Sequence, residues 1–515
     1  MKKEIREKER LWRLLTVALF LLLSIAGFGF SVYLFFVART ILLYAIALLF
    51  LLLSVISGFF NIMASYWYYK SFDYEDYVAN VTKGLKRTVD YPTVSVVIPT
   101  HDESTDMIRR NICRLKTMKY PKGKMSISVL NDSSDKRIRA ELTRICKETS
   151  VRFIYRDSNK GFKAGAINNF LKYSRDEFVA IFDADEYLVN RNFLMDVIPY
   201  FQDKKIAFVQ TEKRYQKGTF FSESIDIFDA FFFKFIETAR AMDHTAIFSG
   251  SCGVIRRSVI DDVGGMPEYA IEDTFFSLES DLKGNVGFYL PKVYALGEPI
   301  TTFSKLVKQQ WRYNFGDTQF ILYYLGKKER KAKDIMSKIN YMAHGFGLNY
   351  LSVMLILFTI LSTAIVFSSL PFAHISISLF SVTHMSMLEI AELLGLFAFL
   401  LSMFAPAILT KIYFKSFKKG IMVFLLNYAL AFVRTKAAIS VFFGKEKKLN
   451  WTSKDAKRPG ILEVLNRTRI EVAFVVIMAA LGVFALSRYN ISGGVWLIWY
   501  GVMYSLTSIF LYKYG

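Results

Sequence analysis

Two aspartates separated by one residue, Asp183 and Asp185, directly follow the apolar run FVAIF. Alternate residues of a β-strand point to the same face of a sheet, so we expect both carboxylates to point the same way. Paired hard oxygen ligands at the end of a strand suit Mg²⁺ or Mn²⁺ bound together with phosphate oxygens. A solvated acidic turn is the alternative, and the position of the pair after an apolar strand favours the metal site.

A second acidic pair, Glu272 and Asp273, follows the glycine-rich turn GGMPEY. A carboxylate placed beside a sugar hydroxyl can act as a general base. Acidic residues are also common at the N-termini of helices, where they favour the helix dipole. The pair taken alone therefore leaves both interpretations open.

A helical pattern further along the chain carries Gln309, Arg312 and Tyr313. These residues stand at i, i+3 and i+4, so they share one face of the helix. Together they offer an amide, a cation and an aromatic surface, which suits a pyrophosphate and a sugar ring. A helix at a membrane interface, where Trp, Tyr and Arg are usual, would show the same residue types.

Two loops could contact a nucleotide. The pair Asn131-Asp132 ends a predicted strand, where a side chain could hydrogen-bond a nucleobase or ribose or could cap the next helix. The segment NKGFKAG at 159–165 joins a strand to a helix, and its glycines and lysines could approach a pyrophosphate. A glycine turn with surface lysines explains it equally well. It is not a Walker A loop, because the sequence GxxxxGK followed by Ser or Thr is absent.

These residues need a scaffold that brings strand ends together. Short β-rich runs alternate with helical patterns, such as those at 106–118 and 163–173. This alternation predicts an α/β domain with a mostly parallel sheet covered on both faces. The predicted strands are 93–100, 126–132, 152–157, 178–185 and 206–211. Ligands of open α/β sheets bind beyond the carboxyl ends of the strands, so the polar strand ends are expected to form the site.

The composition indicates that this domain belongs to a membrane protein. The chain has 515 residues, 53% of them hydrophobic, and a formal net charge of +21. The apolar content excludes a disordered chain and is too high for a soluble DNA-binding protein, so we expect no nucleic-acid partner. Cys113, Cys146 and Cys252 are the three cysteines, and the lack of a CxxC pair argues against disulfides and a structural zinc site.

Apolar runs flank the α/β domain on both sides, and six of them are predicted to span a bilayer. The predicted spans are 14–38, 40–69, 346–369, 390–410, 473–487 and 494–512. The basic N-terminal segment MKKEIREKERLWR then places both termini and the α/β domain on the cytoplasmic side of the cell membrane. The run 421–443 is interrupted by Arg434 and Lys436, so we interpret it as an interfacial amphipathic helix, with a tilted or re-entrant span as the alternative.

Taken in order, these motifs resemble the family 2 glycosyltransferases of GT-A fold, and most of all the processive, membrane-embedded cellulose, chitin and hyaluronan synthases. The matching segments are VSVVIPTHDES, LNDSSD, NKGFKAGAIN, FDADE, VQTEKRY, FSGSCGVIRR, IEDTFFSLES, QQWRY and LNWTSK. The departures from the family motifs are Asn131 for an acid, Ser249 for a cysteine, Tyr313 for a tryptophan, and Leu449 and Trp451 in the gating loop. The changes at Ser249 and Tyr313 leave the acceptor sugar open and weaken the expectation of processivity.

The resemblance implies an α/β GT-A domain inserted between transmembrane helices. The implied regions are an N-terminal transmembrane hairpin at 1–69, a cytoplasmic GT-A domain at 70–300, interfacial helices at 301–345, and a C-terminal transmembrane region at 346–515 with a gating loop near 445–458.

The resemblance also implies roles for individual residues. Asp185, with Asp183 nearby, would hold Mg²⁺ or Mn²⁺, and Asp273, beside Glu272, would be the general base. Nucleotide and diphosphate contacts are implied for Pro99, Thr100, Asp102, Glu103, Asp132, Lys163, Gly165, Gln309, Arg312, Thr452 and Lys454. Acceptor contacts are implied for Phe248, Ser249, Gly250, Ser251, Trp311 and Tyr313.

The implied activity is the inverting transfer of a sugar from a nucleotide sugar, most simply a UDP-sugar, to a growing polysaccharide. The same chain would export the polymer through its own membrane channel. Transfer of one sugar to a lipid acceptor is the alternative, and a membrane transporter with a nucleotide-sensing domain is a more distant one. The expected partners are a nucleotide-sugar donor, a polysaccharide or lipid-linked acceptor and the bilayer, with an accessory subunit left open.

Overall fold

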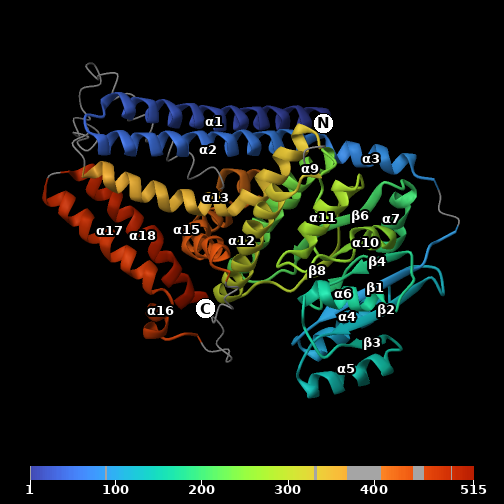
Figure 1. The fold of residues 1–515 in the computed structure, drawn as a ribbon. Helices are drawn as coiled ribbons and strands as arrows, with labels where there is room; N and C mark the ends of the chain where they lie inside the picture. Colours follow the sequence, from blue (N-terminus) through green and yellow to red (C-terminus); the bar gives the residue numbers. More distant parts are fainter. Residues whose placement is uncertain (1, 87–89, 330–332, 368–406, 445–457, 489) are drawn as a thin grey trace.

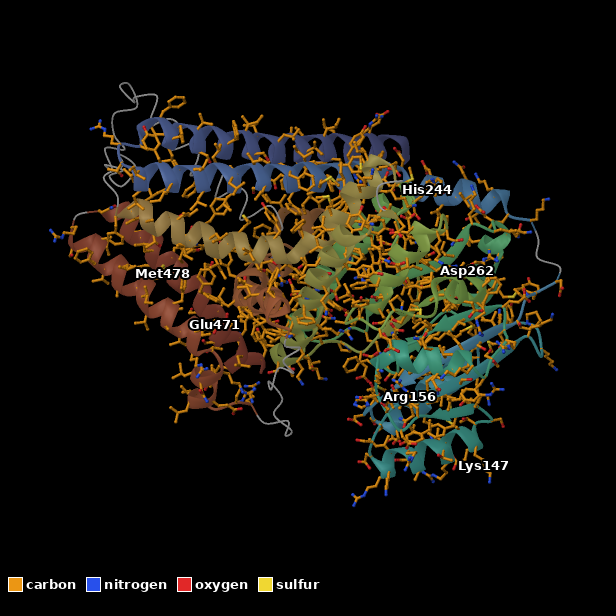
Figure 2. The ribbon with its side chains drawn as sticks, in the orientation of Figure 1. Lys147, Arg156, His244, Asp262, Glu471 and Met478 are labelled. Carbon is orange, nitrogen blue, oxygen red and sulfur yellow. The ribbon has the colours of Figure 1, made fainter. Side chains whose placement is uncertain are left out.

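The computed structural model describes residues 2–86, 90–329, 333–367, 407–444, 458–488 and 490–515. An α/β domain lies beside a group of long helices, which precede and follow it in the sequence (Figure 1). Glu471 and Met478 belong to the long helices, whereas Lys147, Arg156 and Asp262 belong to the α/β domain (Figure 2). The domain is thus inserted between apolar helices, as the sequence predicts.

A mixed sheet of eight strands, in the order β3-β2-β1-β4-β7-β6-β8-β5, forms the centre of the α/β domain. The strands are β1 (Val94–Thr100), β2 (Met125–Asn131), β3 (Arg152–Tyr155), β4 (Phe178–Ile181), β5 (Glu186–Leu188), β6 (Ile206–Tyr215), β7 (Gly253–Arg256) and β8 (Val286–Gly297). Strands β3, β2, β1 and β4 pair in parallel, as do β6 and β8. Strand β7 runs antiparallel to β4 and β6, and β5 runs antiparallel to β8.

The five predicted strands are confirmed, and the sheet is mostly parallel as predicted, since six of its eight strands run in one direction and β5 and β7 run in the other. The sequence pattern does not predict β5, β7 and β8, and two of these, β5 and β7, are the antiparallel strands. Strands β5 and β7 have only three and four residues, and β8 is interrupted by a proline, so none shows a clear apolar run.

Helices cover both faces of this sheet. They are α3 (Tyr74–Gly84), α4 (Thr105–Leu115), α5 (Lys136–Glu148), α6 (Phe162–Leu171), α7 (Phe193–Val197), α8 (Phe220–Phe231), α9 (Thr238–Met242), α10 (Arg257–Val263) and α11 (Glu272–Leu282), with a π-helix at Phe232–Glu237. The two apolar cores divide along β1: Val96 and Ile98 pack with Ile112 of α4, and Val97 packs with Ile167 of α6. This alternation is the period of two that a strand buried on both faces requires.

The long helices form the second part of the molecule. They are α1 (Lys2–Val37), α2 (Ile41–Lys70), α12 (Phe303–Gly326), α13 (Ile335–Val366), α15 (Phe417–Ser440), α16 (Ile461–Arg467, the shortest), α17 (Arg469–Ser487) and α18 (Ile491–Tyr514). Helices α1 and α2 form an antiparallel hairpin (Figure 1). Its small residues allow close packing, since the hydroxyls of Ser31 and Ser54 hydrogen-bond across it at 2.6 Å.

In the described residues, five helices are long and apolar enough to cross a membrane, or six if the two halves of α13, bent by 60° near Gly347, count as one span. They indicate a membrane protein. Four predicted spans, 14–38, 40–69, 473–487 and 494–512, coincide with α1, α2, α17 and α18. The predicted span 346–369 begins inside α13 and forms its second half, and 390–410 lies almost entirely outside the described residues.

Helix α15 differs from the other candidate spans. It meets the same length and hydropathy criteria, but 67% of its most apolar stretch is buried inside the protein, against 7% for α1. The two cations in the second half of this helix have buried partners: Arg434 donates to Gln310 Oε1 (2.9 Å), and Lys436 lies 2.7 Å from Glu471. It packs against α8 and α12 as well as against α13 and α18, so its interfacial position stays a prediction that this burial supports.

Candidate active site

Asp183 and Asp185 lie in the turn after β4, which ends at Ile181. The predicted strand to Asp185 is therefore too long, and strand alternation does not set the directions of these carboxylates. Hydrogen bonds hold the turn instead. The backbone N–H of Asp183 donates to Glu186 Oε2 (2.9 Å), and the Asn111 amide donates to the Asp183 carbonyl (3.0 Å).

The two aspartates have opposite electrostatic surroundings. Burial disfavours the charged form of Asp183, but Lys163 and Lys213 outweigh it and hold the pKa of that carboxyl well below its usual range. Burial, together with the charges of Asp183 and Glu186, raises the pKa of Asp185 to about 7. No ion pair reaches Asp185 within the ranges that the structure describes.

This donor set fits a divalent cation. Carboxylate oxygens are the ligands that Mg²⁺ and Mn²⁺ prefer, and a bound cation would relieve the unfavourable charge at Asp185. The described residues contain no group of three His, Cys, Asp or Glu side chains arranged to hold a metal. The protein would therefore supply one or two carboxylates and leave the other positions to phosphate oxygens and water, as is usual for Mg²⁺.

Glu272 and Asp273 are the first two residues of α11. The backbone N–H of Thr274 donates to Asp273 Oδ1 (2.8 Å), which fixes one oxygen of that carboxylate. Burial raises the pKa of Asp273, although Lys163 and Arg312 oppose the rise. Burial and then the charge of Asp273 raise the pKa of Glu272 to about 7. The pair thus provides carboxylates that are more basic than free ones.

Helix α12 brings its predicted face toward these acids. Gln309 Nε2 donates to the hydroxyls of Tyr215 (3.4 Å) and Tyr313 (3.3 Å). The Arg312 guanidinium lies over the Tyr313 ring at 5.4 Å. Desolvation opposes the Arg312 charge, but Tyr313 and the carboxylates of α11 outweigh it and raise the Arg312 pKa. The adjacent Trp311 instead packs in the apolar cluster of α8, α12, α15 and α18, so the structure does not bring it to the acids.

The segment Phe248–Ser251 borders the candidate site mainly through the backbone of Gly250 and not through exposed side chains. Phe248 is fully buried against Phe208, and the Ser251 hydroxyl is buried and donates to Glu186 Oε1 (2.6 Å). Both side chains thus have partners inside the protein, and the acceptor contacts implied for Phe248 and Ser251 stay a prediction. Ser249 is held by its backbone N–H, which donates to Gln210 Oε1 (2.8 Å). Gly250 lies close to Asp273, since a Cβ built on Gly250 would lie 2.7 Å from Asp273 Oδ2.

Residues of the predicted nucleotide loops lie at the carboxyl ends of β1 and β2. Pro99 and Thr100 end β1, Asp102 and Glu103 follow on its exposed loop, and Asp132 follows β2. The Ser133 hydroxyl donates to Asp102 Oδ1 (2.7 Å) and so ties the two loops together.

Two predicted nucleotide residues have structural partners. Asp132 accepts two hydrogen bonds from the Arg156 guanidinium, which also donates to the carbonyls of Lys160 and Phe162. A Cβ added at Gly165 would lie 2.1 Å from the Lys160 carbonyl oxygen. The close approach of this loop therefore explains the glycine without a pyrophosphate. Thr452 and Lys454 lie outside the described residues.

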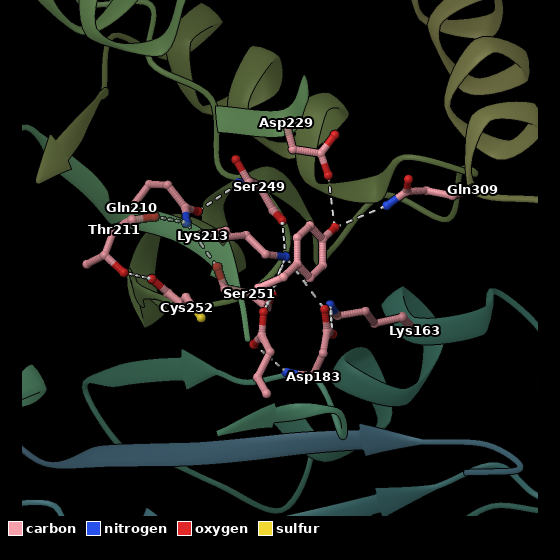
Figure 3. A network of polar contacts seen from close by, with 12 residues as sticks. Lys163, Asp183, Gln210, Thr211, Lys213, Asp229, Ser249, Ser251, Cys252 and Gln309 are labelled. Atoms are coloured by element: carbon pink, nitrogen blue, oxygen red, sulfur yellow. Dashed lines mark hydrogen bonds and ion pairs between the residues drawn. The ribbon is translucent and has the colours of Figure 1, made fainter. Parts of the chain in front are cut away.

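Lys213 is a site residue that the motifs do not single out. It stands on β6, and its ammonium lies between the turn of Asp183 and the segment of Ser249 and Ser251 (Figure 3). One feature of the sequence could have pointed to Lys213. The charged run EKRY directly continues an apolar strand, and charged residues are unusual in a strand that is otherwise buried.

The predictions for Gly250 can be tested by adding one carbon. A Cβ there would lie 2.7 Å from Asp273 Oδ2, so Gly250→Ala is expected to displace the carboxylate and lower activity by about 10²-fold. The control is Gly264→Ala, because Gly264 also has a positive φ (92° against 82°) but open space around it. That variant should lose about 1 kcal/mol of stability and no activity. Equal activity of the two variants would contradict the assigned geometry.

Comparison with known proteins identifies the domain. Residues 95–264 match the family described as Glycosyl transferase family 2. The chain carries a family 2 glycosyl transferase domain. The UDP-forming cellulose synthase catalytic subunit of Pseudomonas fluorescens (strain SBW25) is 31% identical over 45% of this chain and 32% of that protein. Probable glucomannan 4-beta-mannosyltransferase 7 of Oryza sativa subsp. japonica is 28% identical over 50% of this chain and 46% of that protein.

The chain spans about a third of the length of that cellulose synthase and under half of the rice protein. Among solved structures, the mannosyltransferase PcManGT from Pyrobaculum calidifontis, determined with GDP-Man and Mn²⁺, aligns over 76% of this chain and 99% of its own, with a TM-score of 0.52 and 16% identity. This likeness establishes the GT-A fold for the family 2 domain, which agrees with its sheet.

Proposed function

We propose that the protein is a membrane-integrated, inverting glycosyltransferase. It transfers a sugar from a nucleotide sugar, in the first instance a UDP-sugar, to a growing polysaccharide. The observation that carries this proposal is the convergence of two acidic pairs, Asp183 with Asp185 and Glu272 with Asp273, on shared cations. Lys163 interacts electrostatically with Asp183, Glu272 and Asp273. A cation-rich place for a diphosphate thus lies beside a candidate base.

The donor diphosphate would bind between the two acidic pairs. Asp185, with Asp183, would hold Mg²⁺ or Mn²⁺, which supplies positive charge to the leaving diphosphate as its charge develops. Lys163 and Arg312 add two protein cations on the same side. Such fixed charges act without reorganisation during the reaction, which is the main way a protein lowers the barrier to departure of an anion.

Asp273 would accept the proton of the acceptor hydroxyl. The acceptor oxygen then forms its bond to the anomeric carbon while the bond from that carbon to the diphosphate oxygen breaks, and the configuration inverts. One base suffices for this single displacement, so a second carboxylate acting as a nucleophile, as in retaining glycosidases, is not needed. Glu272 stands beside the base and raises the density of negative charge there.

The polymeric acceptor is supported by two facts. The relatives include proteins named as cellulose synthases and a glucomannan mannosyltransferase, and two helices, the candidate span α18 and the predicted interfacial helix α15, pack against α12, which carries Arg312. A growing polysaccharide could thus pass from the site to a channel in the same chain. The catalytic domain and both termini would be cytoplasmic. A contact between the C-terminus and the catalytic domain supports this, because the Tyr514 ring stacks on that of Phe221 in α8, with 4.3 Å between the ring centroids.

Inverted membrane vesicles supplied with labelled UDP-sugars and Mn²⁺ or Mg²⁺ test this function. The expected result is UDP release with incorporation of label into a high-molecular-weight product. Label recovered entirely as a monosaccharide lipid in organic solvent would overturn the polymeric acceptor and support transfer to a lipid. Absence of UDP release with every donor would overturn the enzymatic proposal.

A pH profile tests the acidic pair on α11. Burial raises the pKa of the Asp273 base above that of a free aspartate, so activity should rise with pH at values above the ordinary carboxyl range. Glu272→Gln removes the neighbouring negative charge, and the rise should then move to lower pH because Asp273 ionises more easily. The measurement is the rate of UDP release at saturating donor between pH 5.5 and 8.5. A profile that is flat for both proteins would contradict the role of the pair.

A further inference from the structure

The Lys213 side chain joins two segments of the site. Its Nζ donates to the Ser251 hydroxyl (2.6 Å) and to the Ser249 carbonyl (3.3 Å). On the other side it lies 3.4 Å from Glu186 Oε1 and 3.8 Å from Asp183 Oδ2. Figure 3 shows the Lys213 chain entering the centre of this network from β6.

A second lysine holds the other oxygen of the same aspartate. Lys163 forms an ion pair with Asp183 through Oδ1, while Lys213 faces Oδ2. Both oxygens of Asp183 are therefore turned toward ammonium groups (Figure 3). The charges of three carboxylates interact here, those of Asp183, Asp185 and Glu186, and the two lysines offset the charges of Asp183 and Glu186. A divalent cation that binds without a nucleotide therefore meets little uncompensated negative charge. One of its two candidate ligands, Asp183, is also already paired with the lysines.

A nucleotide diphosphate changes this balance. It carries at least two negative charges, and lysine ammonium groups on flexible stems reorient readily toward phosphate. The side chains involved are reachable, since Asp183 is 34% exposed, Lys213 29% and Lys163 21%. If the two lysines turn toward a diphosphate, Asp183 becomes available as a metal ligand. The lysines then lose the Asp183 carboxylate as a partner and gain the phosphate oxygens in its place.

We propose that Lys163 and Lys213 make cation binding at Asp183 and Asp185 conditional on the nucleotide diphosphate. The divalent cation binds weakly to the free protein and tightly together with the nucleotide. Lys213 acts here as a positioning residue, because in the free protein its bonds to Ser249 and Ser251 hold its ammonium beside Asp183, from which it can turn to the diphosphate. This inference rests on the proposed binding of a nucleotide sugar, but it concerns only binding and not transfer.

Titration of Mn²⁺ tests the inference without any turnover. Full-length protein in nanodiscs is titrated with Mn²⁺ alone, with Mn²⁺ and UDP, and with Mn²⁺ and GDP, and free Mn²⁺ is read by electron paramagnetic resonance. For the wild type, at least one nucleotide should tighten Mn²⁺ binding by about tenfold or more. Lys213→Met should tighten the binding of Mn²⁺ alone by several-fold, about 3 to 10 times, and reduce the effect of the nucleotide.

Two further variants serve as controls. Lys213→Arg keeps the charge and should resemble the wild type. Lys217→Met removes the same charge from an exposed residue four positions along the chain and should leave Mn²⁺ binding unchanged. Equal Mn²⁺ affinity with and without both nucleotides would overturn the inference, as would a Lys213→Met protein that folds normally and binds Mn²⁺ alone no more tightly than the wild type. Conditional binding without sugar transfer would instead overturn only the proposed function.

Discussion

Asp273→Asn is expected to lower the rate of sugar transfer by about 10³-fold, because general-base catalysis contributes 10² to 10⁴ to rates. Asparagine keeps the size and the hydrogen bond from Thr274, but it cannot accept the proton of the acceptor hydroxyl. The carboxylate lies close to Gly250 and interacts with Lys163 and Arg312, which belong to the proposed diphosphate site. The rate of UDP release from purified protein in nanodiscs, with saturating donor, measures the effect.

The loss must be specific to chemistry. The affinity for the nucleotide, measured by calorimetry with UDP and Mn²⁺, should change by no more than about 3-fold. The reason is that the base contacts the acceptor rather than the nucleotide. Asp262→Asn is the matched control, because Asp262 is an exposed aspartate on the nearby helix α10. It should keep full activity. Transfer by Asp273→Asn at the wild-type rate would remove the general-base assignment and leave Glu272 as the next candidate.

The sequence predicts five of the six strands that run in one direction and misses β8 and the two antiparallel strands, β5 and β7, for a physical reason. Strands β1 and β4 are buried on both faces, so they appear as largely apolar runs, whereas β2 is buried on both faces only over its last four residues. Strand β7 owes its place to pairing with β4 and β6 on either side, which no local pattern reveals. Its four residues, GVIR, have too little periodicity to be recognised.

Some residues of the candidate site can likewise be predicted from the sequence, whereas others cannot. The acidic pairs and the α12 face are recognisable because chemistry requires particular residue types at short spacings. The burial of Phe248 and the apolar packing of Trp311 depend on contacts with Phe208 and with helices from distant parts of the chain. Lys213 becomes visible only when β6 places its ammonium between two segments about 30 to 40 residues away in the sequence. Spacing along the chain contains none of this information.

The second large effect is expected where the helical part joins the α/β domain. Arg240 of α9 is fully buried, and its guanidinium donates to the carbonyls of Thr245 (3.0 Å) and Asn340 (2.6 Å). The Asn340 side chain, on α13, in turn accepts a hydrogen bond from the indole of Trp67 on α2 (2.8 Å) and donates to Asp243 (2.9 Å). One buried polar cluster thus connects α2, α9 and α13.

Arg240→Met is expected to lower the free energy of unfolding by about 3 kcal/mol, because it leaves two buried carbonyls without their donor. Methionine fills much of the same volume, so the lost hydrogen bonds rather than a cavity should dominate. Thermal unfolding in mild detergent, followed by near-ultraviolet circular dichroism, measures the change. Separate transitions for the α/β domain and the apolar helices should then appear, since the cluster that makes them unfold together is broken.

The control for this loss is Arg144→Met, since the Arg144 side chain is 64% exposed and its carboxylate neighbours on α5 lie at 3.9 Å. Exposed pairs of this kind contribute about 0 to 1 kcal/mol, so its unfolding should match the wild type. A wild-type midpoint for Arg240→Met would show that the apolar contacts of α2 and α13 alone hold the two parts together. A single transition at a lower midpoint would mean that the protein still unfolds as one cooperative unit without the cluster. Two separate transitions would instead establish that Arg240 couples the membrane helices to the α/β domain.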